Sequence, residues 1–303
     1  MQDRYAGDIG DFGKISLLKE LHCQGLSIGV NWYRTDPLSS EIKTDGSYKQ
    51  NDGGYVISPK LRECDPLLAE KLTEIAEGDD RSICALERAS LIPDAVYFSK
   101  TVPVKNRDDW HAQALSFFGK NNAALVFLDP DNGLLPSVKK GSPRSVKYAY
   151  YEEVEDYLRN GHSVLIYNHR SRKSEEQYFS EIESRLRSSI PESLRDTGIF
   201  AITFPRYSVR DYFAIPALPE HAKMIQIAFS TMLSGIWKDK KMCQKPLTAD
   251  ITYSEYRKRF RSVNDFLRHY QSLTEETVRK MIDLDEGNTT VKACMYSAWK
   301  RNK

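Results

Sequence analysis

Long hydrophobic runs are missing from this chain of 303 residues. No apolar stretch approaches the roughly 20 residues that a helix needs to span a bilayer. The first residues, Met-Gln-Asp-Arg-Tyr, also lack the cationic segment followed by an apolar segment that marks a secretory signal. We therefore expect a cytoplasmic protein that has no membrane partner.

Cysteine is scarce and scattered. No two cysteines form a Cys-x-x-Cys pair, and the five are Cys23, Cys64, Cys84, Cys243 and Cys294. Zinc clusters need closely spaced ligands, and disulfide frameworks use an even number of cysteines. The spacing therefore argues against a zinc cluster and more strongly against a disulfide framework. Reduced thiols are expected, as in the cytosol.

An excess of charge of either sign is also missing. The 44 Lys and Arg residues nearly match the 42 Asp and Glu residues, which leaves a formal charge of +2. Such a total neither requires nor excludes a nucleic-acid partner, because a local basic face matters more than the sum. The length is sufficient for one sizeable α/β domain with an appendage, or for two small domains.

The most informative segment that is present is an apolar run that ends abruptly in polar residues. Residues 124–128 read Ala-Leu-Val-Phe-Leu, and Asp-Pro-Asp-Asn-Gly follows at 129–133. The run has the length of a buried parallel strand, and Pro130 must end it because proline has no backbone donor. Ligands bind at the carboxyl ends of strands in open α/β sheets, so this polar cluster is a candidate site. An ordinary Asp/Asn/Gly turn is the alternative explanation.

The order of the expected elements favours an α/β fold. We expect helices at 11–24, 66–77, 81–89, 107–119, 152–159, 175–188 and 222–233, strands at 27–33, 96–99, 124–128, 163–167, 199–204 and 212–218, and a long loop at 36–58. Alternating strands and helices indicate a parallel sheet covered on both faces. The last two strands are joined by too few residues for a crossover helix and must be antiparallel. Residues 1–245 are therefore expected to form a Rossmann-like, mostly parallel sheet with a terminal antiparallel hairpin strand.

Residues 246–303 are expected to form a small helical C-terminal appendage. Residues 252–271 interleave aromatic and basic side chains, and further helices are expected at 274–282 and 291–299. The interleaved stretch could stack on bases and contact phosphates. An amphipathic helix with packed aromatic residues would have the same composition.

Two motifs resemble those of a known family. The opening Tyr-Ala-Gly-Asp-Ile-Gly-Asp-Phe-Gly-Lys, residues 5–14, resembles the His-Ala-Gly-Asn-x-x-Asp-x-x-Lys opening of RlmJ-type rRNA adenine-N6 methyltransferases. Residues 129–132 resemble the Asp-Pro-Pro-Tyr motif of the same family. The likeness extends over about residues 1–235 in the order of elements. The chain is also similar to a group of bacterial proteins that share the Gly-Asp-x-x-Asp-Phe-x-Lys opening and the Leu-Asp-Pro-Asp-Asn-Gly motif.

The resemblance implies a methyltransferase that uses S-adenosylmethionine and acts on DNA or RNA. Asp129 would accept a hydrogen bond from the substrate amine, so that catalysis would consist mostly of positioning. The candidate catalytic residues are Asp129, Asp131, Asn132, Lys14 and His169, and the candidate cofactor-binding residues are Tyr5, Asp8, Asp11 and Asn31. His169 and Asn31 lie outside the two motifs and are included because they end strands at the same edge of the expected sheet. A helix cap at Asp8 or Asp11, a solvated Lys14 and an ordinary loop histidine are the alternatives.

Two departures from the family keep other functions open. No Asp-x-x-x-Gly-x-Gly loop follows the strand at 27–33, although such glycines let the backbone approach a cofactor closely. Asp131 and Asn132 replace the proline and the aromatic residue that would stack on an extruded base. A metal-dependent nuclease or hydrolase is one alternative, with Mg²⁺ or Mn²⁺ bound by Asp8, Asp11, Asp129 and Asp131. A degenerate, non-catalytic nucleic-acid-binding module is another, and the sequence leaves the oligomeric state open.

Overall fold

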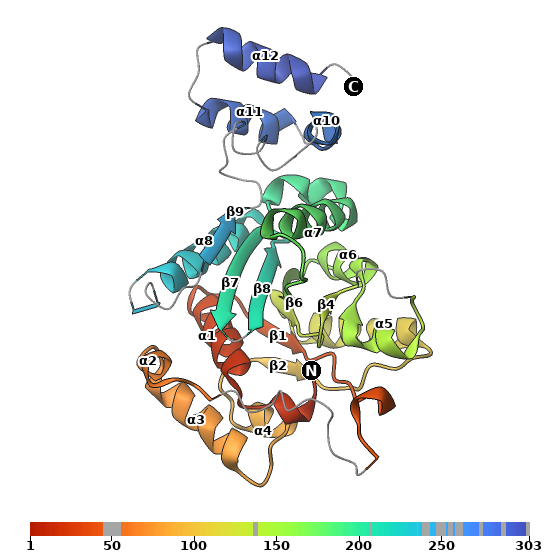
Figure 1. Cartoon of the computed structure of the whole chain (residues 1–303), viewed down its shortest axis with the longest axis vertical. Helices are drawn as coiled ribbons and strands as arrows, with labels where there is room; N and C mark the ends of the chain where they lie inside the picture. Colours follow the sequence, from red (N-terminus) through yellow and green to blue (C-terminus); the bar gives the residue numbers. More distant parts are fainter. Residues whose placement is uncertain are drawn as a thin grey trace.

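A computed structural model of the chain describes residues 1–44, 56–135, 139–206, 208–234, 236–237, 243–246, 253, 257, 263–272, 275–285 and 289–300. A twisted sheet with helices on both faces forms its main body (Figure 1). The expected α/β fold class, a Rossmann-like and mostly parallel sheet, is confirmed. Residues 45–55 of the expected long loop at 36–58 lie outside the described residues.

Seven strands form the main sheet in the order β2-β1-β3-β6-β8-β7-β9. They are β1 (Ile28–Asn31), β2 (Val96–Phe98), β3 (Leu125–Leu128), β6 (Ser163–His169), β7 (Phe200–Arg206), β8 (Ser208–Ile215) and β9 (Cys243–Pro246). Strands β2, β1, β3 and β6 pair in parallel. Strand β8 is antiparallel to both β6 and β7, which confirms the expected terminal hairpin. Strand β9 pairs with β7 and was not expected, and it ends at residue 246, where the appendage was expected to begin.

The strand order reverses around β1. The chain leaves β1 for β2 on one side and later returns to form β3 on the other side. In open α/β sheets, the crevice outside the carboxyl ends of the strands at such a reversal is where ligands bind. The ends of β1 and β3 therefore mark the place to look for a functional site.

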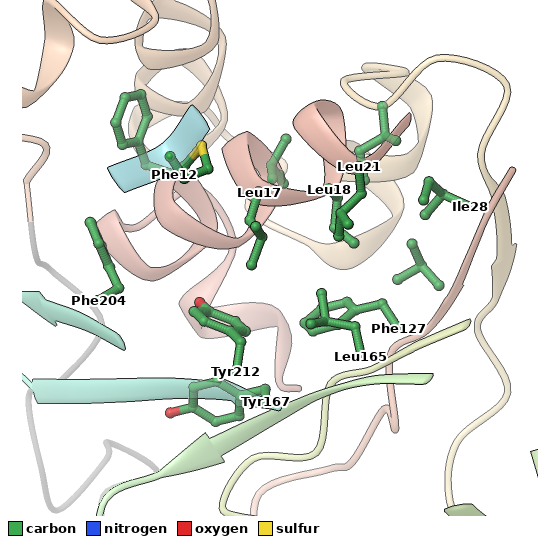
Figure 2. Packing of buried hydrophobic residues seen from close by; sticks show 14 of the residues in the cluster. Phe12, Leu17, Leu18, Leu21, Ile28, Phe127, Leu165, Tyr167, Phe204 and Tyr212 are labelled. Atoms are coloured by element: carbon green, nitrogen blue, oxygen red, sulfur yellow. The ribbon is translucent and has the colours of Figure 1, made fainter. Parts of the chain in front are cut away.

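Helices cover both faces of the sheet because the strand residues alternate between two hydrophobic cores. Phe127 belongs to the core beneath α1 (Ile9–Cys23), α3 (Pro66–Glu77), α4 (Ile83–Arg88) and α8 (Pro219–Leu233). Its neighbours Val126 and Leu128 belong to the core beneath α5 (Arg107–Lys120), α6 (Tyr151–Arg159) and α7 (Glu175–Ser189). Figure 2 shows Leu17 and Leu18 of α1 lying over Phe127 and Leu165 of the sheet.

The sequence cues at helix ends are confirmed at α3 and only partly at α5. Helix α3 begins at Pro66, and the Asp65 side chain accepts the Leu68 N–H at 3.0 Å. Asparagine is a favoured N-cap, so the sequence predicts a side-chain cap at Asn106 before α5. Its backbone is left-handed there, with φ +56°, and its side chain makes no capping hydrogen bond, so this prediction is wrong. The short α2 (Pro59–Arg62) precedes α3.

Three C-terminal helices lie beyond the sheet in Figure 1. They are α10 (Val263–Ser272), α11 (Glu275–Leu284) and α12 (Thr289–Lys300). They share a small core of their own, formed by Phe266, Tyr270, Val278, Met281, Ile282 and Trp299. Tyr253 packs edge-on against both Phe266 and Tyr270. The aromatic residues described in this stretch are thus packed, as in the amphipathic alternative. None of the described helices is long and apolar enough to cross a membrane.

Candidate functional site

A cavity of about 350 Å³ opens at the carboxyl edge of the sheet, and we call it the edge pocket. Three parts of the chain supply most of its wall: the N-terminal segment through α1, the loop after β3, and the paired ends of β6 and β8. Its wall includes eight of the nine predicted site residues, namely Tyr5, Asp8, Asp11, Lys14, Asp129, Asp131, Asn132 and His169. The structure therefore brings residues 5–14 and 129–132 together, as the two motifs predict.

The N-terminus of α1 is closed by its own carboxylates. The Asp8 side chain accepts the backbone N–H groups of Gly10 at 2.6 Å and Asp11 at 3.1 Å. One oxygen of Asp11 in turn accepts the N–H of Gly7 at 2.8 Å. The alternative that Asp8 caps the helix is therefore confirmed, and capping aspartates are also favoured by the helix dipole. The second Asp8 oxygen lies 3.9 Å from the Arg210 guanidinium inside the pocket.

A buried ammonium group joins the two motifs. Lys14 Nζ lies 2.6 Å from Asp129 Oδ2 and 3.0 Å from Asp11 Oδ1. All three side chains are less than a tenth exposed, so the lysine is not a solvated surface residue. The i,i+3 spacing of Asp11 and Lys14 allows them to pair on one helix face, and the structure shows this pair.

One ammonium group cannot neutralise two buried carboxylates. Burial raises the pKa of Asp129 above its ordinary value, and Lys14 offsets this only in part. Burial likewise raises the pKa of Asp11, with Lys14 opposing and the nearby Asp8 adding to the shift. Burial alone would lower the pKa of Lys14, but the charges of Asp129 and Asp11 raise it, so the lysine stays protonated. The cluster thus has a fixed cation beside carboxylates that accept protons readily.

Asp131 has cationic partners other than Lys14. The α-amino group of Met1 lies 2.9 Å from Asp131 Oδ1, and Lys147 Nζ lies 3.3 Å from Oδ2. The Gln2 side-chain amide also donates to Oδ2, at 2.7 Å. Burial raises the pKa of Asp131, but the charges of Met1 and Lys147 outweigh this and lower it below its ordinary value. Asp131 therefore remains a carboxylate and anchors the segments around it.

Residue Met1 lies at the reversal of the strand order itself. Its α-amino group donates hydrogen bonds of 3.0 to 3.1 Å to the carbonyl oxygens of Trp32, Tyr33 and Asp129. Those oxygens belong to the residues directly after β1 and β3. Part of the crevice where a nucleotide would enter a doubly wound sheet is therefore occupied by the chain.

The glycine that closes the Asp-Pro-Asp-Asn-Gly motif is required by a close approach. Gly133 has a φ of +99°, and a β-carbon there would lie 2.0 Å from Asn168 Oδ1. The same Asn168 oxygen accepts the N–H of Leu134 at 2.7 Å. Gly133 and Leu134 form β4 (Gly133–Leu134), which pairs in parallel with β5 (Tyr148–Ala149). These contacts hold Asn132, which is partly exposed, in the pocket wall.

His169 ends β6 and is paired in the sheet with Arg210 of β8. Its Nδ1 lies 3.4 Å from the Tyr167 hydroxyl. Partial burial and the positive charge of Arg210 lower the pKa of His169 below 6.5. The imidazole is therefore neutral near pH 7 and can accept a proton.

The structure corrects the prediction for Asn31. This residue is fully buried and is absent from the wall of the edge pocket. Its side-chain amide donates to the Tyr157 hydroxyl at 3.0 Å, and its carbonyl oxygen accepts the Tyr33 N–H at 3.2 Å. The side chain points toward α6, so Asn31 stabilises the core and does not face a ligand.

Several pocket residues were not predicted from the sequence, namely Arg4, Glu41, Lys147, Tyr167 and Arg210. The register between β6 and β8 brings Arg210 beside His169, so a correct hairpin register would have identified it. Lys147 carried no sequence signal. It reaches the pocket through the pairing of β4 and β5 and forms an ion pair of 2.7 Å with Glu41.

The four carboxylates proposed for a metal site do not converge. Asp8 caps α1, Asp129 pairs with Lys14, and Asp131 pairs with Met1 and Lys147. Within the described ranges, no three His, Cys, Asp or Glu side chains are grouped in a way that could hold a metal ion. The arrangement is instead charge-balanced: five carboxylates line the pocket together with four cationic side chains and the α-amino group of Met1. It can hold a polar ligand of mixed charge and exchange protons with it.

No protein-family model matches the chain, and no curated protein matches its sequence.

Proposed function

We propose that the chain is a methyltransferase that uses S-adenosylmethionine and methylates an amino group of a nucleic acid. The observation that carries the proposal is the position of Asp129. It follows β3 at the reversal of the strand order, lines the edge pocket, and is held by Lys14 at 2.6 Å. A carboxylate fixed in this way is suited to orient an amine.

The residues of the edge pocket fit the proposed cofactor in charge and in size. Its volume of about 350 Å³ lies at the low end of the roughly 300–1,000 Å³ of small-molecule sites. S-adenosylmethionine has an amino-acid part with one ammonium and one carboxylate group, and a charge-balanced pocket suits such a ligand. Arg4 and Arg210 would hold the carboxylate, and Asp8 would hold the ammonium group.

The residues of the chain would position the acceptor amine and accept the proton that it releases. The bound cofactor would supply the methyl group. Asp129 would accept a hydrogen bond from the acceptor amine and direct its lone pair, while Lys14 keeps the carboxylate in place. Neutral His169, in the same pocket wall, would take the proton that the amine releases.

Calorimetric titration with S-adenosylmethionine tests the proposal first, followed by transfer of labelled methyl groups to DNA and RNA. We expect binding in about the micromolar range. In Asp129→Asn, the dissociation constant should change by less than about threefold while the transfer rate falls by about 100-fold or more. The matched control is Asp283→Asn, at an exposed position of α11, and it should change neither quantity. A fully active Asp129→Asn variant would overturn the site assignment.

Two observations favour a second candidate, a non-catalytic nucleic-acid-binding module of the same fold. The segment after β1 has no glycine loop, and Met1 occupies the crevice between β1 and β3. Failure to bind the cofactor at about 1 mM, together with salt-dependent affinity for DNA or RNA, would favour this candidate. The carboxylate pairing described above provides no comparable support for a metal-dependent hydrolase.

A further inference from the structure

A second cavity, of about 410 Å³, adjoins the edge pocket, and we call it the side pocket. Asn132 and His169 belong to the walls of both cavities. These two residues follow β3 and end β6, which are neighbours in the sheet. A ligand in the side pocket would therefore lie across Asn132 and His169 from a ligand in the edge pocket.

Part of the wall of the side pocket is aromatic and apolar. The rings of Tyr148 and Tyr178 and the side chain of Ile182 line it. The Tyr178 hydroxyl accepts a hydrogen bond from the Asn168 side-chain amide at 2.6 Å, and the ring packs edge-on against Phe179. The Tyr178 ring is nearly buried and the Arg170 guanidinium lies 5.7 Å from its centre, so it forms a fixed part of the wall. The partly exposed Tyr148 ring can stack on a planar aromatic ligand.

The two cavities differ in charge. The charges that line the edge pocket are balanced, whereas the side pocket is lined by Arg170, Lys173 and Arg185 with one carboxylate, Glu181. Arg170 is already held by Asp211 and Glu175, at 2.6 Å each. Lys173 pairs with Glu181, but both side chains are more than a third exposed. Such surface pairs contribute little and exchange readily for another anion. Lys173 is therefore the cation of the side pocket at which an anionic group is favoured.

We infer that the side pocket binds a nucleotide unit, with the base against Tyr148, Tyr178 and Ile182 and the phosphate at Lys173. That the side pocket holds the nucleotide whose amino group is methylated rests on the methyltransferase proposed above. Nucleotide binding at this place does not rest on it. Asn132 and His169 would then form the shared wall across which the acceptor amine faces the edge pocket.

Adenosine 5′-monophosphate is the probe, titrated calorimetrically into the full chain. We expect saturable binding, with a dissociation constant below about 1 mM. Ile182→Trp fills the apolar wall and should weaken this binding by about tenfold or more, in keeping with the contribution of stacking. Lys173→Glu reverses an exposed charge that the fold does not need and should weaken it by about threefold or more. Lys71→Glu, an equally exposed lysine on α3, is the control and should leave it unchanged.

The same variants are titrated with S-adenosylmethionine, so that the two proposals fail separately. The inference predicts that the nucleotide still binds when the cofactor is saturating and that Lys173→Glu leaves cofactor affinity unchanged. Absence of nucleotide binding at about 10 mM, or nucleotide affinity that both variants leave intact, would overturn the inference whether or not the cofactor binds. Nucleotide binding that the variants weaken, in a chain that does not bind the cofactor, would support the side pocket and overturn the methyltransferase.

Discussion

At the scale of single residues, the buried pair between Lys14 and Asp129 determines what the site can do. A buried ion pair is costly to break, because removal of one partner leaves the other charge buried without compensation. In this site the ammonium faces two carboxylates, Asp129 and Asp11, whose pKa values burial already raises. Lys14 is therefore expected to contribute to stability as well as to the position of Asp129.

Replacement of Lys14 with methionine should lower the free energy of unfolding by about 3–5 kcal/mol. Addition of Asp129→Asn to that variant should restore part of the loss, because one uncompensated carboxylate is then gone. Urea denaturation of the two single variants and the double variant measures the coupling. Lys19→Met, on the same helix, breaks a more exposed pair with Asp65 and should cost no more than about 1 kcal/mol. Equal losses in Lys14→Met and Lys19→Met would contradict this role.

His169 should make stability depend on pH. Partial burial and Arg210 lower its pKa in the folded chain below 6.5, so the unfolded chain binds more protons in that range. Stability from this residue is therefore present above about pH 6.5 and is lost as the pH falls through the folded-state pKa. The difference in unfolding free energy between the wild type and His169→Gln should grow as the pH rises from about 5 to about 7 and then level off. A difference that shrinks over this interval would show that the pKa is raised instead.

At the scale of elements, the loop between β3 and β4 depends on one backbone conformation. Gly133→Ala places a β-carbon against Asn168 and strains a left-handed residue, so we expect destabilisation by about 2–3 kcal/mol or more. Gly119→Ala is the matched substitution, at a position of α5 where a β-carbon meets nothing within 4 Å. It should be neutral or stabilising by up to about 1 kcal/mol. Thermal and urea unfolding compare the two variants. Equal effects would show that Asn168 moves to accommodate the added β-carbon at little cost in stability.

Elements with a strong local pattern were predictable from the sequence. Helix α3 has the expected bounds, because Pro66 and Gly78 punctuate it and its apolar residues recur with the helical period. The short strands β4, β5 and β9 were missed, because two to four residues carry no periodicity and are defined by tertiary pairing.

Site residues within a local sequence motif were likewise predictable, whereas those placed by strand pairing were not. Residues 5–14 and 129–132 were recognisable because each motif combines several polar side chains at the end of a structural element. Asn31 was wrongly assigned because side chains alternate along a strand, and one step in register decides which face a residue takes. Lys147 and Arg210 reach the pocket through strand pairing, which their own neighbours in the sequence do not reveal.

At the scale of the whole molecule, the chain has two cores that share the sheet and a third that does not. The first two cores meet through alternate residues of the same strands, so loss of packing in one affects the other. The third core, in α10 to α12, contains no residue of the main sheet among those described. The main sheet with its covering helices and the C-terminal helices α10 to α12 are therefore expected to unfold in separate steps.

Matched large-to-small substitutions test this separation. Met281 in the third core and Leu165 in the sheet are both nearly fully buried, and truncation of either to alanine should cost about 2–5 kcal/mol locally. In Met281→Ala, amide hydrogen exchange should accelerate in α10, α11 and α12 while β3 and β6 keep their protection. Leu165→Ala should instead accelerate exchange throughout the sheet and in α1, which packs on the same core. If Met281→Ala also loosens β3 and β6 to the same degree, the C-terminal helices are part of one cooperative unit with the sheet. The edge pocket would then depend on them for its stability.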